Sequence, residues 1–171
     1  MKRSKRQRLW DPYRKVIDRL NRQGVAYVVV GMAGINYYAK NAAEMFATVD
    51  YDLFLEPTLH NVEKAVQLLS AMGFTLTTAK GPFTREGLRQ PVRNQETFVA
   101  ATPEGVTVEL LLRVSGYPFS EMARDAATFT VDGVPVRVGK LTKLLNSKRT
   151  ANRPKDRQFL RRYQSLLEHE S

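Results

Sequence analysis

The sequence predicts a single α/β (α+β) domain in which a mixed, twisted β-sheet is flanked by helices and a helical pair ends the chain. The order of hydrophobic patterns carries this prediction: helix, strand, helix, strand and helix precede several strands and then two helices. The 171 residues, 43% of them hydrophobic, suffice to bury the core of one domain. The absence of cysteine excludes zinc ribbons, thiol nucleophiles and disulfide frameworks.

The first half of the chain alternates between helical and extended patterns. Asp11 and Pro12 are typical of a helix N-cap with proline in the first turn, and Gly24 ends the apolar repeat that follows. A β-branched apolar run at 25–31 is typical of a buried strand, and alternation at 49–56 predicts a strand with one polar face. The other elements expected in this half are a short helix around 35–38 and a crossover helix at 58–72.

The second half combines hairpins with two closing helices. The elements expected in order are a strand at 74–78, a polar loop at 80–93, a hairpin of strands 96–102 and 106–113, a second hairpin turning at Asp132 and Gly133, and helices at 141–151 and 155–168. Within the one domain we expect a flexible basic arm at 1–10, a core at 11–138, and a C-terminal basic helical module at 139–171 that packs on the core.

Charge is distributed unevenly along the chain, whose formal net charge is +10. Residues 1–24 hold nine basic and two acidic side chains (+7), residues 25–138 nine and twelve (−3), and residues 139–171 nine and three (+6). Basic ends around a slightly acidic middle predict an anionic partner, most often a nucleic acid. Neither a secretory signal nor a run of roughly 18 apolar residues is present, so we expect a cytoplasmic protein without a membrane span.

Two carboxylates on one predicted strand are the main chemical signal. Asp50 and Asp52 leave the same face of the strand at 49–56, with α-carbons about 6.5 to 7 Å apart. Glu109, inside an otherwise apolar strand, is the best third member. Three converging carboxylates suit one or two Mg²⁺ ions, which take hard oxygen ligands and leave positions for water and phosphate. The alternative is that Asp50 and Asp52 line the solvated face of an antiparallel sheet.

Two charged residues near the C-terminus lie on helix faces that should point inward. Lys148 follows Leu141, Leu144 and Leu145 at helical spacing, and Asp156 shares a face with the apolar residues of the last helix. One interpretation is a functional pair. The alternatives are a snorkelling lysine at the edge of the core and an acid that is favourable to the helix dipole.

Two segments resemble the DNA polymerase β-type nucleotidyltransferase superfamily. The run VVVGMAGINYYAKNAAEMFATVDYDLFL at 28–55 resembles its strand, glycine turn, helix and Asp-hydrophobic-Asp-hydrophobic hallmark. The run SKRTANRPKD at 147–156 resembles the lysine and Arg-Pro-Lys-Asp signature of minimal members related to the toxins of type IV toxin–antitoxin pairs. Met32 stands where the family has a second glycine or a serine, and Phe46 replaces the arginine two positions before Thr48.

The resemblance implies a nucleotidyltransferase fold and a Mg²⁺-dependent enzyme that moves an NMP from an NTP to an acceptor hydroxyl. It implies Asp50, Asp52 and Glu109 as metal ligands, with Glu109 a ligand or general base, and Lys148 and Asp156 as further catalytic residues. The expected substrate-binding residues are Gly31, Met32, Thr48, Lys148, Arg153 and Lys155. The first choice of acceptor is a tRNA 3′ end, modified by a toxin whose cognate antitoxin is a protein partner.

Other functions stay open at this point. One is adenylylation of a protein partner, as in antitoxin-type nucleotidyltransferases. An antibiotic acceptor ranks third, because a cationic drug fits a basic surround poorly. The last is a non-catalytic module that binds RNA or nucleotides, in which Met32 and Phe46 mark a degenerate site.

Overall fold

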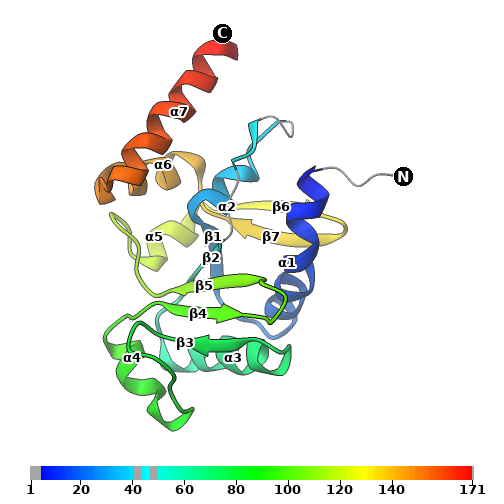
Figure 1. Cartoon of the computed structure of the whole chain (residues 1–171), viewed down its shortest axis with the longest axis vertical. Helices are drawn as coiled ribbons and strands as arrows, with labels where there is room; N and C mark the ends of the chain where they lie inside the picture. The colour runs from blue at the N-terminus through cyan, green and yellow to red at the C-terminus, as the bar shows by residue number, and fades with distance from the viewer. Residues whose placement is uncertain (1–4, 41–43, 47–49, 171) are drawn as a thin grey trace.

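The structure is a computed structural model that describes residues 5–40, 44–46 and 50–170. Within these ranges the chain forms seven α-helices, one 3-10 helix and seven strands (Figure 1). The first half comprises α1 (Lys5–Arg22), β1 (Tyr27–Val30), α2 (Gly31–Asn36), β2 (Asp50–Leu55), α3 (Leu59–Ala71) and β3 (Thr75–Thr77). The second half comprises η2 (Glu86–Leu88), α4 (Arg89–Arg93), β4 (Phe98–Ala101), β5 (Thr107–Leu111), α5 (Phe119–Arg124), β6 (Ala127–Val131), β7 (Val134–Val138), α6 (Leu141–Ala151) and α7 (Pro154–Glu170). No helix among the described residues has the length and apolarity that a membrane crossing needs.

The strands form one mixed sheet with the order β3-β4-β5-β2-β1-β7-β6. β2 runs parallel to β5 and β1 runs parallel to β7, whereas the other neighbouring pairs are antiparallel. The predicted α/β class with a mixed sheet and flanking helices is thus confirmed. The two hairpins and the closing helical pair also lie where the sequence predicted them, because turn residues and apolar repeats are local signals.

The central strand β2 is covered on both faces. Tyr51 stacks on Tyr13, with ring centroids 4.2 Å apart, so α1 lies against the face of Tyr51. Phe54 points to the opposite face and meets Phe119 of α5 edge-on, at 5.4 Å between centroids. The two aspartates of β2 lie on the Phe54 face. Because Phe54 itself is buried, the polar face predicted for the whole strand is limited to its beginning.

Helix α1 begins at Lys5 rather than at the predicted Asp11, so residues 5–10 are helical and not a flexible arm. Trp10 explains the difference, because its side chain is buried and meets the Tyr37 ring edge-on at 6.2 Å. The helix therefore continues through Pro12, and burial of Trp10 helps to offset the cost of proline in a helix interior. Residues 1–4 of the predicted arm lie outside the described residues.

Three short helical segments were missed by the sequence prediction. The segment at 80–93, predicted as a polar loop, contains η2 and α4, which bury Leu88 and Val92. Helix α5, which lies between the two hairpins, buries Met122 completely. Each of these segments has six residues or fewer, so none spans the two turns needed to reveal an apolar repeat.

Candidate functional site

Three carboxylates gather on one face of the sheet, where the parallel strands β2 and β5 meet. Asp52 lies directly opposite Glu109 in the strand register, and Asp50 lies opposite Thr107. Because side chains two residues apart share a face, Asp50 projects to the same side as Asp52 and Glu109. The carboxyl groups of Asp52 and Glu109 share a hydrogen bond. The structure thus brings together the three carboxylates that the sequence singled out.

These groups perturb one another's ionisation. Burial, followed by the charges of Glu109 and Asp50, raises the pKa of Asp52 to about 7, although the charge of Lys148 acts in the opposite direction. Burial and the charge of Asp50 also raise the pKa of Glu109, and two nearby cations oppose that rise. Near neutral pH the Asp52 carboxyl group is therefore partly protonated, as expected for a buried carboxyl group beside two others.

The donor set has the chemistry that Mg²⁺ requires, because it offers hard carboxylate oxygens on one face. Oδ1 of Asp52 is buried without a hydrogen-bond partner, so it is an acceptor that a ligand can still satisfy. As placed, however, no group of three or more His, Cys, Asp or Glu side chains in the described ranges could hold a metal ion. Protonation of Asp52, whose pKa is raised to about 7, reduces the repulsion between the carboxyl groups. The three-carboxylate metal centre remains a prediction that the donor chemistry fits.

The turn between β1 and α2 lies against the carboxyl group of Asp52. Gly31 has a φ of +65°, which favours glycine, and a Cβ at this position would lie 2.3 Å from Oδ2 of Asp52. A larger residue at this turn would therefore displace the carboxyl group. The next residue, Met32, is half-buried and packs against the core. The sequence assigned both turn residues to substrate binding. In the structure Gly31 lies against the Asp52 carboxyl group, whereas Met32 packs against the core.

Helices α6 and α7 bring a lysine and an aspartate together. Nζ of Lys148 lies 3.6 Å from Oδ1 of Asp156 and 4.8 Å from the centroid of the Phe159 ring. The guanidinium Nε of Arg153 donates to Oδ2 of Asp156 at 2.7 Å, and the Arg153 backbone N–H donates to the same oxygen at 3.2 Å. The Asp156 side chain is 1% exposed and that of Lys148 13%. The sequence prediction that both side chains point inward is confirmed.

Charge coupling links this helical pair to the sheet carboxylates. Burial lowers the pKa of Lys148, and the charges of Asp156 and Asp52 partly restore it. Burial alone would raise the pKa of Asp156, but the hydrogen bonds and charge of Arg153 hold it below its usual value. The charges of the exposed Lys155 and of Arg153 also lower the pKa of Glu109. The three cations assigned to substrate therefore lie within electrostatic range of the carboxylates.

The segment before β2 holds two further positions of the resemblance. Thr48 lies outside the described residues. Phe46 is buried, and its ring lies 4.6 Å from that of Phe159 on α7. The side-chain amide of Asn36 binds the Phe46 backbone on both sides, donating to the carbonyl at 2.9 Å and accepting from the N–H at 2.8 Å. Position 46 therefore anchors this segment to α2 and α7, and Arg162 of α7 lies over the ring at 5.3 Å.

Tyr13 is a residue near the site that sequence reasoning did not identify. Burial raises the pKa of Tyr13, and the charges of Asp50 and Asp52 raise it further, so its phenol lies within electrostatic range of both carboxylates. Its ring stacks on Tyr51, which fixes its position at the start of β2. No sequence signal distinguishes Tyr13, because it lies on the apolar stripe of α1 and has the pattern of a core residue.

A scan of the chain against protein-family models finds no match, and a search of curated proteins likewise finds none.

Proposed function

We propose that this protein is a Mg²⁺-dependent nucleotidyltransferase that moves an NMP from an NTP to an acceptor hydroxyl. The observation that carries the proposal is the register of β2 and β5, which sets Asp52 beside Glu109 with Asp50 on the same face. The Gly31 turn contacts this cluster, and Lys148 is coupled to it by charge. Nucleotidyl transfer requires a site for metal ions and a site for phosphates. Clustered carboxylates suit the metal, and the cations beside them suit the phosphates.

In this proposal Asp50, Asp52 and Glu109 hold the metal. When bound, Mg²⁺ supplies positive charge at the α-phosphate. Metal binding requires that Asp52, whose pKa is about 7, gives up its proton, so we expect tighter metal binding above pH 7 than below it. In the alternative assignment Glu109 is a general base rather than a metal ligand, and its raised pKa then suits it to accept the proton of the acceptor hydroxyl.

The cations at the junction of α6 and α7 are assigned to the triphosphate. Lys148 has three N–H donors, and its contact with Asp156 leaves others for phosphate oxygens. Asp156 is nearly fully buried and acts through Lys148 and Arg153, so it is a positioning residue rather than a catalytic one. Lys155 is exposed at the start of α7 and is free to turn towards a bound nucleotide.

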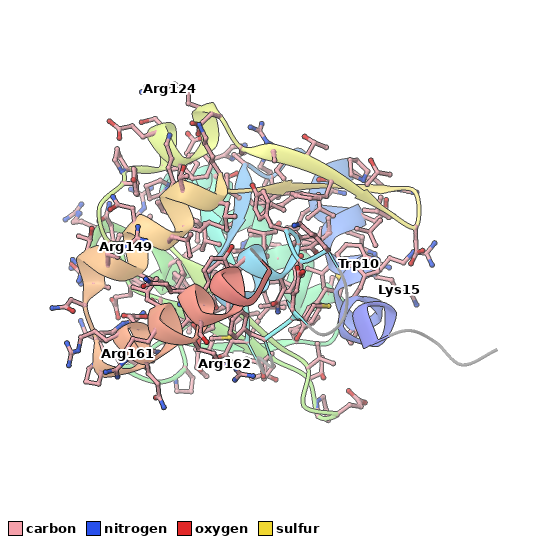
Figure 2. All side chains as sticks on the ribbon, turned by 90° about the horizontal axis from the view of Figure 1, so that it is seen from above. Trp10, Lys15, Arg124, Arg149, Arg161 and Arg162 are labelled. Carbon is pink, nitrogen blue, oxygen red and sulfur yellow. The ribbon has the colours of Figure 1, made fainter. Side chains whose placement is uncertain are left out.

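The acceptor proposed is a tRNA 3′ end, modified in the cytoplasm by a toxin that a protein antitoxin controls. The support is the resemblance at 147–156 and the basic surface beside the site. Figure 2 shows Arg149, Arg161 and Arg162 on α6 and α7, well apart from Trp10 on α1. All three arginines are exposed and can contact an RNA backbone, in a salt-dependent way.

A non-catalytic module that binds RNA or nucleotides is the second candidate. Two observations favour it. In the described ranges the carboxylates are not arranged so that three of them could bind one metal ion. Phe46, which stands where the family has an arginine, packs against Phe159. Both candidates predict nucleotide binding at the same place. They differ only in whether a phosphoester bond is made.

The test is transfer of label from α-labelled NTPs, each supplied in turn with Mg²⁺ and total RNA or a cell lysate. We expect label in an RNA or protein acceptor with the wild-type chain, and a loss of at least ~100-fold with Asp52→Asn. The matched control is Glu104→Gln, which alters an exposed carboxyl group in the turn between β4 and β5 and should leave transfer unchanged.

The outcomes separate the candidates. Label in RNA supports the tRNA acceptor, and label in protein supports adenylylation of a partner. Transfer that survives Asp52→Asn refutes the proposed site. A wild-type chain that binds Mg²⁺ and NTP but labels no acceptor identifies the non-catalytic module.

A further inference from the structure

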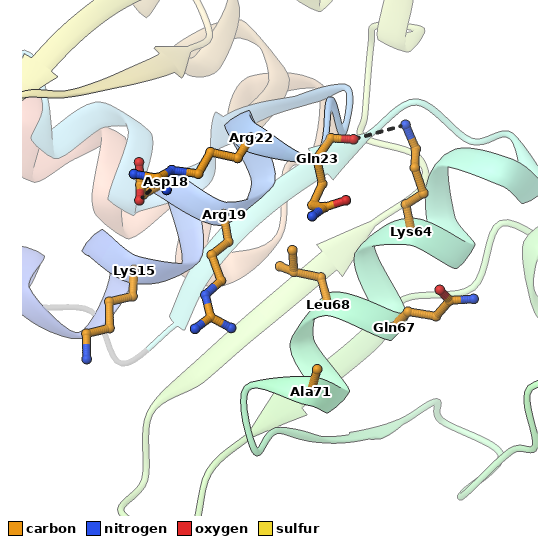
Figure 3. A pocket seen from close by; sticks show the side chains of 9 residues that line it. All are labelled: Lys15, Asp18, Arg19, Arg22, Gln23, Lys64, Gln67, Leu68 and Ala71. Atoms are coloured by element: carbon orange, nitrogen blue, oxygen red, sulfur yellow. Dashed lines mark hydrogen bonds and ion pairs between the residues drawn. The ribbon is translucent and has the colours of Figure 1, made fainter.

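A basic groove lies between α1 and α3, on a different side of the sheet from the carboxylates (Figure 3). Because Tyr13 of α1 stacks on Tyr51, α1 covers the face of β2 that is opposite to the aspartates. The groove has a volume of about 760 Å³. Its charged and amide lining comes from both helices: Lys15, Asp18, Arg19 and Arg22 from α1, and Lys64 and Gln67 from α3.

Two of the four cations in the groove are held by the protein, and two are available. Nε of Arg22 pairs with Asp18 at 3.2 Å, and Nζ of Lys64 donates to the Gly24 carbonyl at 3.1 Å. Among the described residues, the side chains of Lys15 and Arg19 make neither a hydrogen bond nor an ion pair. Figure 3 shows Arg19 extending from α1 towards α3. The groove therefore presents unpaired positive charge to solvent.

We propose that this groove binds the phosphate backbone of a nucleic acid. Lys15 and Arg19 follow one another at i and i+4 on α1, so they are about 6 Å apart along the helix axis at 1.5 Å per residue. That spacing is on the scale of neighbouring phosphates along one nucleic-acid strand, so the two cations can contact adjacent phosphates. The amide of Gln67 adds a donor for phosphate oxygens.

The lining also indicates how the nucleic acid is recognised. The groove has no aromatic side chain on which a base could stack, so contacts are expected to be independent of sequence. An acidic protein is the less favoured partner, because protein interfaces usually centre on buried aromatic anchors, which the groove lacks. Binding here contacts the body of an RNA rather than its reacting end, since the groove and the carboxylates lie on opposite faces.

The test is fluorescence anisotropy of labelled bulk tRNA titrated with Lys15→Glu/Arg19→Glu over a series of salt concentrations. The matched control is Arg89→Glu/Arg93→Glu, which reverses two exposed charges at the same i, i+4 spacing on α4. We expect the groove variant to raise Kd by at least about tenfold at low salt and to reduce the slope of log K against log salt by about 2. The control variant should change Kd by less than about threefold.

Equal weakening by the two variants would overturn the proposal, because it would mean that net charge alone governs binding. An unchanged Kd for the groove variant would also overturn it, and loss of polyglutamate binding by that variant would then identify an acidic protein as the partner. Circular dichroism and Tm confirm that both variants fold. The tRNA titration is repeated with Asp52→Asn, which should still bind tRNA in the groove. This result separates the groove inference from the proposed transferase activity, which Asp52→Asn should abolish.

Discussion

Replacing Asp52 by asparagine is expected to raise the free energy of unfolding near pH 8, without divalent cations, and to leave it nearly unchanged near pH 4. Burial and the neighbouring carboxylates raise the pKa of Asp52 from 3.8 to about 7 in the folded protein. The stability that a raised carboxyl pKa contributes is fully present below pH 3.8 and is lost as the pH rises through about 7. Above that range the folded protein carries a buried charge that asparagine removes while keeping the side-chain shape.

The expected rise in the free energy of unfolding is large for a single substitution. A shift of about three pKa units corresponds to roughly 4 kcal/mol, or a rise in Tm on the order of 10 °C for a domain of this size. Thermal unfolding in EDTA at the two pH values measures it, with Glu104→Gln as the exposed control. An equal gain at both pH values, or a loss near pH 8, would contradict the environment assigned to Asp52.

Replacing Asp156 by alanine is expected to destabilise the fold by about 3 kcal/mol. The substitution removes the acceptor of three Arg153 hydrogen bonds. It also leaves Lys148, which is 13% exposed and lies over the Phe159 ring, without its anionic partner. Because Arg153 holds the pKa of Asp156 below 3.8, the stability that Asp156 contributes is present above that pH and is lost as the pH falls further. The loss of stability caused by Asp156→Ala should therefore be smaller at acidic pH.

Denaturant unfolding of three variants separates this role from that of an ordinary surface pair. Asp156→Asn keeps an acceptor and should lose less stability than Asp156→Ala. Asp125→Ala breaks the ion pair with Lys143, at 2.9 Å, in which the carboxyl group is 39% exposed, and should change stability less than Asp156→Ala does. If Asp156→Ala unfolds no more easily than Asp125→Ala, the buried carboxylate does not anchor α7.

The sequence predicted side-chain faces and element bounds correctly wherever a local pattern determines them. The spacing of leucines with Lys148 placed that lysine on the inner face of α6, and the helix bounds agree because Asn152 adopts a left-handed conformation that ends it. The Asp-Tyr-Asp alternation of β2 likewise placed Asp50 and Asp52 on one face. These features depend on neighbours within a few residues, so no long-range contact is needed to predict them.

Long-range geometry could not be predicted in the same way. The register that sets Asp52 opposite Glu109 joins positions far apart in the chain, and the sequence nominated Glu109 only as a polar residue in an apolar strand. The extension of α1 to Lys5 depends on the tertiary burial of Trp10 and overrides the local preference of Pro12. The electrostatic influence of the carboxylates on Tyr13 could not be predicted for the same reason, since a tyrosine on an apolar stripe has no local sign of function.

Binding of Mn²⁺ tests whether the carboxylates of β2 and β5 hold a divalent cation. Mn²⁺ takes the same oxygen ligands as Mg²⁺, and the loss of its free electron paramagnetic resonance signal counts the ions bound. Near pH 8 the wild-type chain and Glu104→Gln should bind Mn²⁺ alike, whereas Asp52→Asn should bind it at least about tenfold more weakly. Equal binding by Asp52→Asn and the wild-type chain would contradict the claim.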